Sequence, residues 1–142
     1  MAAGPAVERL MSEYGQKLRL VIKFYPYKYR DFARISAEAA LAAYDQGKFW
    51  EMHRVLLRRS PQLDRANLIA YAKEIGLNVD KFRESLDKRK NDNIIERDLK
   101  LAISLDLYNT PTFFINGRRV IGDVPYQYLK KIVAEELNAS KK

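Results

Sequence analysis

Cysteine is absent from this sequence of 142 residues, and histidine occurs only once, as His53. Without a thiol, the chain forms no disulfide bond, holds no metal through a thiolate and supplies no thiol nucleophile. A single histidine also excludes a metal site built from several histidines. These two counts exclude thiol chemistry by the chain's own side chains, and they leave the cellular compartment open.

Long apolar runs are missing as well. No stretch approaches the ~18 apolar residues that a membrane-spanning helix needs, so we predict no membrane span. Residues 1–10 show no charged leader followed by an apolar segment, so no signal peptide is expected. What is present suits a globular protein, because 47% of the residues are hydrophobic and 31% are charged. The length predicts a single domain over residues 1–142.

The net charge of +8 raises the question of nucleic-acid binding, which needs basic residues gathered on one face. In the most charged stretch, residues 81–100, acidic residues are interleaved with the basic ones. Mixed signs at helical spacing are typical of a solvated helix face. We therefore predict no nucleic-acid partner.

Hydrophobic periodicity predicts a helix, a strand, a helical block, and then a hairpin of two strands and a last helix. The segment Leu18–Tyr25 alternates and is rich in β-forming residues, which predicts a strand. Asn116-Gly117 between two apolar runs is a strong hairpin signal, and Asp64 and Asp80 are candidate helix N-caps. The expected helices and strands lie at residues 5–14, 18–25, 32–45, 48–59, 65–75, 81–90, 93–107, 112–115, 119–121 and 125–137.

This order predicts an α/β fold. A small mixed sheet is expected to be packed by the first, the long and the last helices, and a helical insertion is expected at about residues 32–90.

The most specific stretch is residues 110–117, Thr-Pro-Thr-Phe-Phe-Ile-Asn-Gly. A bond preceding proline adopts the cis form at a cost of only about 0.5–1 kcal/mol. A cis bond before Pro111 turns neighbouring backbone groups outward, where an extended peptide could pair with them. On the residues alone, this interpretation and a simpler one, in which Pro111 only marks the start of a strand, both stay open.

Several motifs in the same order resemble DsbA-like thioredoxin-fold proteins with a helical insertion. The resemblance covers nearly the whole chain and lies in residues 24–26 (Phe-Tyr-Pro), 37–43, 46–53 (Gln-Gly-Lys-Phe-Trp-Glu-Met-His), 72–77 with Phe82, 110–122 and 124–126. It implies a thioredoxin-like fold in one domain, 1–142.

The resemblance also implies an activity and a binding site. Members of this family exchange thiols and disulfides with protein substrates through a Cys-x-x-Cys pair that faces a cis-proline. Pro111 is then the cis-proline, and Asn109, Thr110 and Pro111 are the expected contacts with protein or peptide substrates. The resemblance places no catalytic residue, metal ligand or cofactor within this sequence. Family members usually work outside the cytoplasm.

This sequence departs from the family at the reactive site, because both cysteines and the central strand that precedes them are missing. We interpret the chain as a truncated oxidoreductase domain or as a redox-inactive descendant, and in either case as inactive alone. Truncation is favoured, because the motifs around the lost site are still in place. The alternatives are a non-enzymatic peptide-binding or chaperone-like module on a thioredoxin fold, or a cysteine-free transferase or isomerase relative that uses glutathione. That last group usually has a serine near the start of the first helix, and none precedes Ser12 here.

Without the central strand, the strands at 18–25 and 112–115 are expected to have unpaired edges. Unpaired edges favour association with another chain. We therefore predict self-association by strand exchange, or a repacking that brings the two strands together.

Two interpretations, ligand binding or packing, are possible for the aromatic side chains outside residues 110–117. Tyr25, Tyr27 and Tyr29 alternate after the predicted strand, where they form either a peptide-binding rim or packing within the loop; packing is favoured. Trp50 and His53 are expected to pack within the helical insertion rather than to bind a ligand or act in catalysis.

Overall fold

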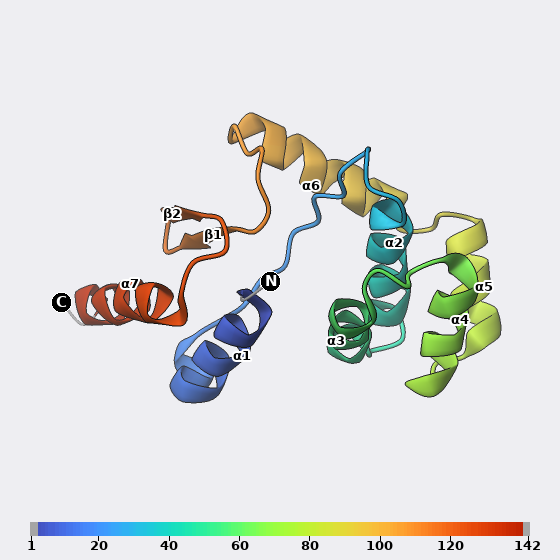
Figure 1. Ribbon diagram of the computed structural model, residues 1–142, viewed down its shortest axis with the longest axis horizontal. Coiled ribbons are helices and arrows are strands. Elements are labelled where there is room, and N and C mark those ends of the chain that lie inside the picture. The colour runs from blue at the N-terminus through green and yellow to red at the C-terminus, as the bar shows by residue number, and fades with distance from the viewer. Residues whose placement is uncertain (1–2, 141–142) are drawn as a thin grey trace. The chain divides into compact units, whose positions relative to one another are not determined.

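The computed structural model describes residues 3–140, and the chain forms two compact units (Figure 1). The first, which we call the sheet unit, contains the described residues up to Ile22 and from Leu105 onward. The second, the helical unit, runs from Lys23 to Ser104. Each unit is described by itself below.

Two helices and a two-stranded antiparallel sheet make up the sheet unit. Its elements are α1 (Ala3–Tyr14), the short 3-10 turn η1 (Gly15–Lys17), β1 (Thr112–Ile115), β2 (Arg118–Ile121) and α7 (Tyr126–Ala139). The register pairs Thr112 with Ile121, Phe113 with Val120, Phe114 with Arg119 and Ile115 with Arg118. Its core joins one face of the hairpin to both helices through Ala6, Leu10, Val120, Leu129, Ile132 and Val133.

The predicted hairpin is confirmed, and its turn explains the register. Asn116 and Gly117 have φ values of 48° and 89°, so both central residues lie in the left-handed region that a two-residue hairpin turn of type I′ requires. Glycine adopts this conformation without steric cost, and asparagine tolerates it better than most residues. The turn residues thus determine which residues of β1 and β2 face each other.

The strand predicted for Leu18–Tyr25 does not form, and this prediction was wrong. The only sheet of the described residues has the order β1–β2. The alternation of the sequence survives as burial, since Leu18, Leu20, Ile22 and Phe24 are half-buried and the residues between them are exposed. A strand is defined by its ladder partner, however, and this segment has none in the described part of the chain.

Five helices make up the helical unit: α2 (Ala33–Tyr44), α3 (Phe49–Arg59), α4 (Arg65–Glu74), α5 (Val79–Asp87) and α6 (Asp92–Ser104). The first four correspond to the helical insertion expected at about 32–90. The alanine-rich face of α2 lets the other helices approach closely, and Met52, Leu68 and Phe82 are completely buried against it. The long helix α6 packs its buried Ile95 on α2; its packing on the sheet stays a prediction.

The helix ends follow local side-chain chemistry. Asp64 caps α4 as predicted, because its carboxylate accepts the N–H groups of Ala66 and Asn67. For α5 the predicted cap was wrong: Asn78, not Asp80, accepts the N–H of Lys81. The helix begins one residue before Asp80, so Asp80 lies in its first turn, where a negative charge is still favourable.

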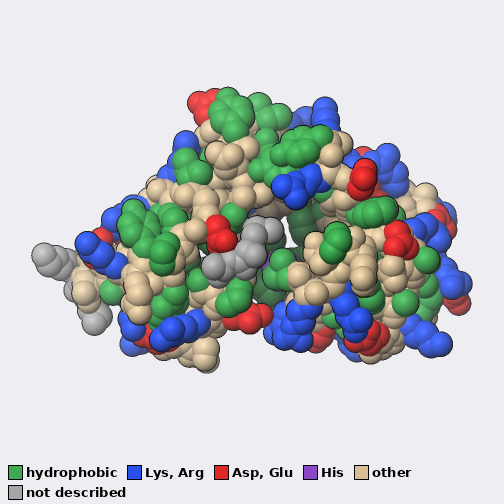
Figure 2. Space-filling view, viewed as in Figure 1, with side chains coloured by type: hydrophobic (Ala, Val, Ile, Leu, Met, Phe, Trp, Pro, Cys, Tyr) green, Lys and Arg blue, Asp and Glu red, His purple; other side chains and the backbone are tan. Residues whose placement is uncertain are grey.

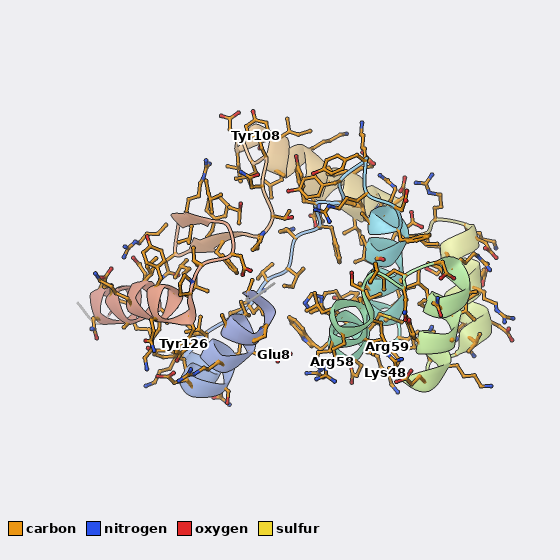
Figure 3. All side chains as sticks on the ribbon, in the orientation of Figure 1. Glu8, Lys48, Arg58, Arg59, Tyr108 and Tyr126 are labelled. Atoms are coloured by element: carbon orange, nitrogen blue, oxygen red, sulfur yellow. The ribbon has the colours of Figure 1, made fainter. Side chains whose placement is uncertain are left out.

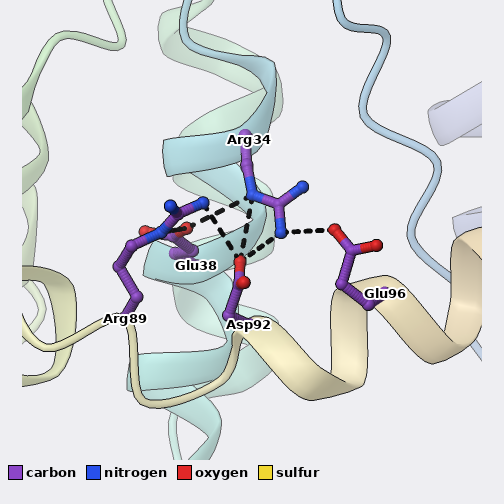
Figure 4. Close-up of polar contacts among 5 residues, drawn as sticks. All are labelled: Arg34, Glu38, Arg89, Asp92 and Glu96. Atoms are coloured by element: carbon purple, nitrogen blue, oxygen red, sulfur yellow. Dashed lines mark hydrogen bonds and ion pairs between the residues drawn. The ribbon is translucent and has the colours of Figure 1, made fainter.

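An ion-pair network joins α2 to α6 (Figure 4). The Arg34 guanidinium bonds Asp92 and, at 2.7 Å, Glu96. Arg89, from the turn before α6, contacts Glu38 at 3.3 Å and Asp92 at 3.2 Å. The hydrogen bond from Arg34 is the main reason that the pKa of Asp92 lies below its ordinary value.

We expect this network to make the stability of the chain sensitive to acid. Because the pKa of Asp92 is lower in the folded chain than in the unfolded one, Asp92 stabilises the fold above about pH 4. This contribution disappears as the pH falls through the folded-state pKa. Asp92→Asn should therefore lower the urea midpoint at neutral pH and have a smaller effect at strongly acidic pH.

The matched control is Asp80→Asn, whose carboxylate is almost fully exposed and lies 4.0 Å from Arg83. It should keep the acid dependence of the unchanged chain. Equal pH profiles for Asp92→Asn and the unchanged chain would contradict the role of the network.

Candidate functional site

The predicted contact residues Asn109, Thr110 and Pro111 lie together in the loop that leads into β1; we call them the Pro111 loop. The Pro111 carbonyl accepts the N–H of Gly122 at 2.8 Å, which extends the hairpin register by one pair. The Thr112 hydroxyl donates to the Asn109 carbonyl at 2.7 Å and closes the loop on itself. The bond between Thr110 and Pro111 is cis.

The register decides which backbone groups of β1 are free to bind. In an antiparallel ladder, pairs that exchange hydrogen bonds alternate with pairs that do not. Since Pro111 and Gly122 are bonded, every second residue of β1 counted from Pro111 directs its backbone groups to β2. The N–H and C=O groups of Thr112 and Phe114 therefore point to the opposite edge.

No strand among residues 3–140 pairs with that edge of β1. The Phe114 side chain beside it is 45% exposed, and the Arg119 guanidinium lies 5.6 Å from the centre of its ring. Arg119 is itself held by a hydrogen bond of 2.6 Å to the Leu105 carbonyl. The edge thus offers backbone donors and acceptors next to an exposed ring and a positioned cation, an arrangement that can accept an extended peptide.

The hairpin rests on a firmly joined pair of helices. Tyr126, at the start of α7, points toward α1, where its hydroxyl donates to Glu13 (Figure 3). Lys130 bonds the same carboxylate at 2.5 Å, and the Arg9 guanidinium lies 4.1 Å from the Tyr126 ring centre. The hydrogen bond from Lys130 is the main reason that the pKa of Glu13 is lowered, and the bond to Glu13 raises the pKa of Tyr126. These contacts hold α1 and α7 beneath the apolar face of the hairpin.

His53 and Trp50 lie on α3, in the other unit, and pack as expected. The His53 ring stacks on Phe49, with ring centres 5.6 Å apart, and Trp50 meets both rings edge-on. Within residues 3–140, no group of three or more His, Asp or Glu side chains is placed to hold a metal ion. None of the described helices has the length and apolar character needed to cross a membrane.

Sequence reasoning identified the Pro111 loop but missed the outward backbone groups of Thr112 and Phe114. The sequence did contain the information needed to find them, because the Asn116-Gly117 turn sets the register of the hairpin, and the register decides which residues of β1 direct their backbone groups outward.

On the face drawn in Figure 2, basic and acidic side chains are interleaved over both units.

Solved structures share this fold. The thiol-disulfide exchange protein α-DsbA2 from Wolbachia pipientis superposes with a TM-score of 0.81 at 22% identity, over 92% of this chain and 71% of that one. A thioredoxin-like oxidoreductase from Silicibacter pomeroyi gives a TM-score of 0.82 at 24% identity, over 99% and 80%. At these identities the likeness establishes the fold.

Curated relatives are more similar in sequence but much longer. The Na(+)/H(+) antiporter NhaA 3 of Salinispora tropica is 42% identical over 125 residues, which are 87% of this chain and 19% of that protein. The antiporter NhaA 1 of Salinispora arenicola is 39% identical over 132 residues, 92% of this chain and 20% of that protein. The chain thus spans about a fifth of the length of these relatives.

The family model described as the DSBA-like thioredoxin domain matches residues 4–134, a range that includes both units. The match covers most of α1, the helical unit, the Pro111 loop, the hairpin and most of α7. The chain has the thioredoxin-like fold with a helical insertion, and it belongs to the DSBA-like thioredoxin domain family.

Proposed function

We propose that this chain is the polypeptide-binding part of a DsbA-family thiol–disulfide oxidoreductase. An extended segment of a protein substrate adds as a strand to the outer edge of β1, beside Asn109, Thr110 and Pro111. The observation that supports this proposal is the pair of outward-facing backbone groups at Thr112 and Phe114. Main-chain hydrogen bonds supply affinity in strand addition and tolerate many substrate sequences, which suits an enzyme family that acts on proteins.

Substrate binding and thiol–disulfide exchange need different groups, and this chain contains only those for binding in our proposal. Thiol–disulfide exchange begins when a thiolate attacks a disulfide sulfur, forming one S–S bond while the leaving sulfur departs as a thiolate. The 142 residues contain no cysteine, so neither the attacking nor the resolving thiol comes from them. We therefore propose that the chain alone binds substrate and does not exchange disulfides.

Phe114→Pro tests strand addition directly. Proline removes the outward N–H of residue 114 and leaves the hydrogen bonds between β1 and β2 in place, a position that edge strands tolerate. Binding of a reduced and alkylated unfolded protein, measured by fluorescence anisotropy, should weaken about tenfold, the effect of losing about 1.4 kcal/mol. Phe114→Ala, which loses the ring but keeps the N–H, should weaken binding less.

Amide exchange in the unchanged chain gives a second readout of the same proposal. On addition of the unfolded protein, hydrogen exchange should slow at the amides of Thr112 and Phe114 and stay unchanged at Phe113, which already faces β2. Equal binding by the proline and alanine variants, together with unchanged exchange at Thr112 and Phe114, would refute the proposed site.

The same open edge also supports self-association, in which β1 of a second copy takes the place of the peptide. Analytical ultracentrifugation should show a mass that rises with concentration for the unchanged chain and stays that of a monomer for Phe114→Pro. A monomer at every concentration would contradict self-association and leave the peptide-binding proposal standing.

A further inference from the structure

The segment Tyr25–Phe32, which we call the tyrosine loop, is fastened to α6 at both ends. At its entrance, the buried Asp98 carboxylate accepts the Phe24 N–H at 3.1 Å and the Lys23 ammonium at 3.0 Å. At its exit, Arg34 of α2 bonds Asp92 and Glu96 of α6 (Figure 4). The loop thus leaves α6 and returns to it within a few residues.

Two consecutive tight turns shape the tyrosine loop. The Arg30 N–H donates to the Tyr27 carbonyl at 3.2 Å, and the Ala33 N–H donates to the Arg30 carbonyl at 3.3 Å. The Tyr27 ring meets Tyr25 edge-on at 5.3 Å and stacks on Tyr29 at 5.1 Å. The packing expected for these tyrosines is present, and it produces an ordered row of rings at the surface.

The outer part of the row stays uncovered in the helical unit. The Tyr29 side chain is 77% exposed and Phe32 is 44% exposed. Phe32 also has a φ of 64°, a left-handed conformation that is strained for a bulky residue. Such strain persists where the surrounding structure holds it, and it is concentrated at binding and catalytic sites.

The tyrosine loop itself carries more positive than negative charge, because Lys28 and Arg30 stand against Asp31. Lys28 and Arg30 form no ion pair with any residue in 3–140, and Asp31 is the only acid of the loop. At the entrance, the Asp98 carboxylate is shared by Lys23 and, at 3.5 Å, by Arg97. The side chains of Lys23 and Arg97 are 47% and 67% exposed while Asp98 is buried, so the entrance of the loop presents positive charge; at the exit, Arg34 and Arg89 are matched by the carboxylates of α2 and α6.

We propose that the tyrosine loop is a docking surface for an acidic polypeptide segment that carries an apolar side chain next to its carboxylates. The carboxylates pair with Lys28 and Arg30, and the apolar side chain packs on Tyr29 and Phe32. Tyrosine and arginine are the residue types that dominate binding energy at protein interfaces. Fastening at both ends reduces the entropy lost on binding. The tyrosine loop belongs to the helical unit, whereas the Pro111 loop belongs to the sheet unit.

A polypeptide partner fits these observations better than a single-stranded nucleic acid. Nucleic acids are bound by successive ring faces along a row of cations. Here the middle ring, Tyr27, already contacts its neighbours, because Tyr29 stacks on it, Tyr25 meets it edge-on and the Arg30 guanidinium lies 6.0 Å from its centre. The exposed Tyr29 and Phe32 beside Lys28 and Arg30, which have no carboxylate partner among residues 3–140, match a short peptide motif rather than a nucleotide chain.

The test uses the whole 142-residue chain and a fluorescein-labelled peptide in which single phenylalanines are separated by glutamate and glycine. Tyr29→Ala combined with Arg30→Glu should weaken binding about tenfold or more, because it removes the exposed ring and reverses a charge. The matched control is Tyr44→Ala combined with Arg54→Glu, which changes an exposed tyrosine and an exposed arginine elsewhere in the same unit. It should bind as the unchanged chain does.

Three further probes decide the class of partner: the same peptide with lysine in place of glutamate, an oligo(dT) strand and phosphatidylglycerol vesicles. We expect the unchanged chain to bind the glutamate peptide most tightly, with an affinity that falls as salt is added. Four results would each overturn the proposal: no binding of the glutamate peptide, an equal loss in both double variants, equal binding of the lysine peptide, or tighter binding of the oligonucleotide or the vesicles through Tyr29 and Arg30.

Discussion

Backbone hydrogen bonding of the β1–β2 hairpin is the constraint on which the candidate site depends. The Asn116-Gly117 turn sets one register, and that register commits alternate residues of β1 to β2. The remaining backbone groups, at Thr112 and Phe114, are then available on the other edge for geometric reasons, whatever side chains they carry. Burying such groups without partners is costly, so an edge of this kind favours the addition of another strand.

In the helical unit, carboxylates on α6 hold the tyrosine loop in place, as the hairpin hydrogen bonds fix the backbone of β1 in the sheet unit. Asp92 and Glu96 bond Arg34 near the start of α2, while Asp98 bonds the chain just before the tyrosine loop. One helix therefore positions both ends of a loop that has no secondary structure of its own. The buried Asp98 is tolerated because a backbone N–H and an ammonium group satisfy its oxygens.

Thiol chemistry and the proposed peptide recognition have different structural requirements. The first needs cysteines, which the 142 residues do not contain. Our proposal for the second depends on a strand edge and a rigid support, for which the hairpin and the joined helices α1 and α7 are the candidates. The two proposed surfaces differ in chemistry as well, since β1 offers backbone groups and the tyrosine loop offers rings and cations.

Local chemistry made much of the fold predictable from the sequence. The Asn116-Gly117 turn, the Asp64 cap and the apolar stripes of the helices each depend on residues close together in the chain, and each was found where expected. The strand predicted at 18–25 failed because a strand also needs a partner, which no local pattern supplies. The N-cap of α5 was also mispredicted, because Asn78 and Asp80 are both residue types that cap helices and the local pattern did not decide between them.

The sequence by itself determined the absence of cysteine from these 142 residues, the hairpin register and the place of Asn109, Thr110 and Pro111 before β1. Only the tertiary structure decided that the tyrosine loop is fastened at both ends, because Phe24 and Asp98 are in contact although they lie 74 positions apart in the sequence. Local sequence patterns determine turns, caps and alternation, which act over a few residues. Contacts between distant residues depend on how whole helices pack, and that packing is settled only when the chain folds.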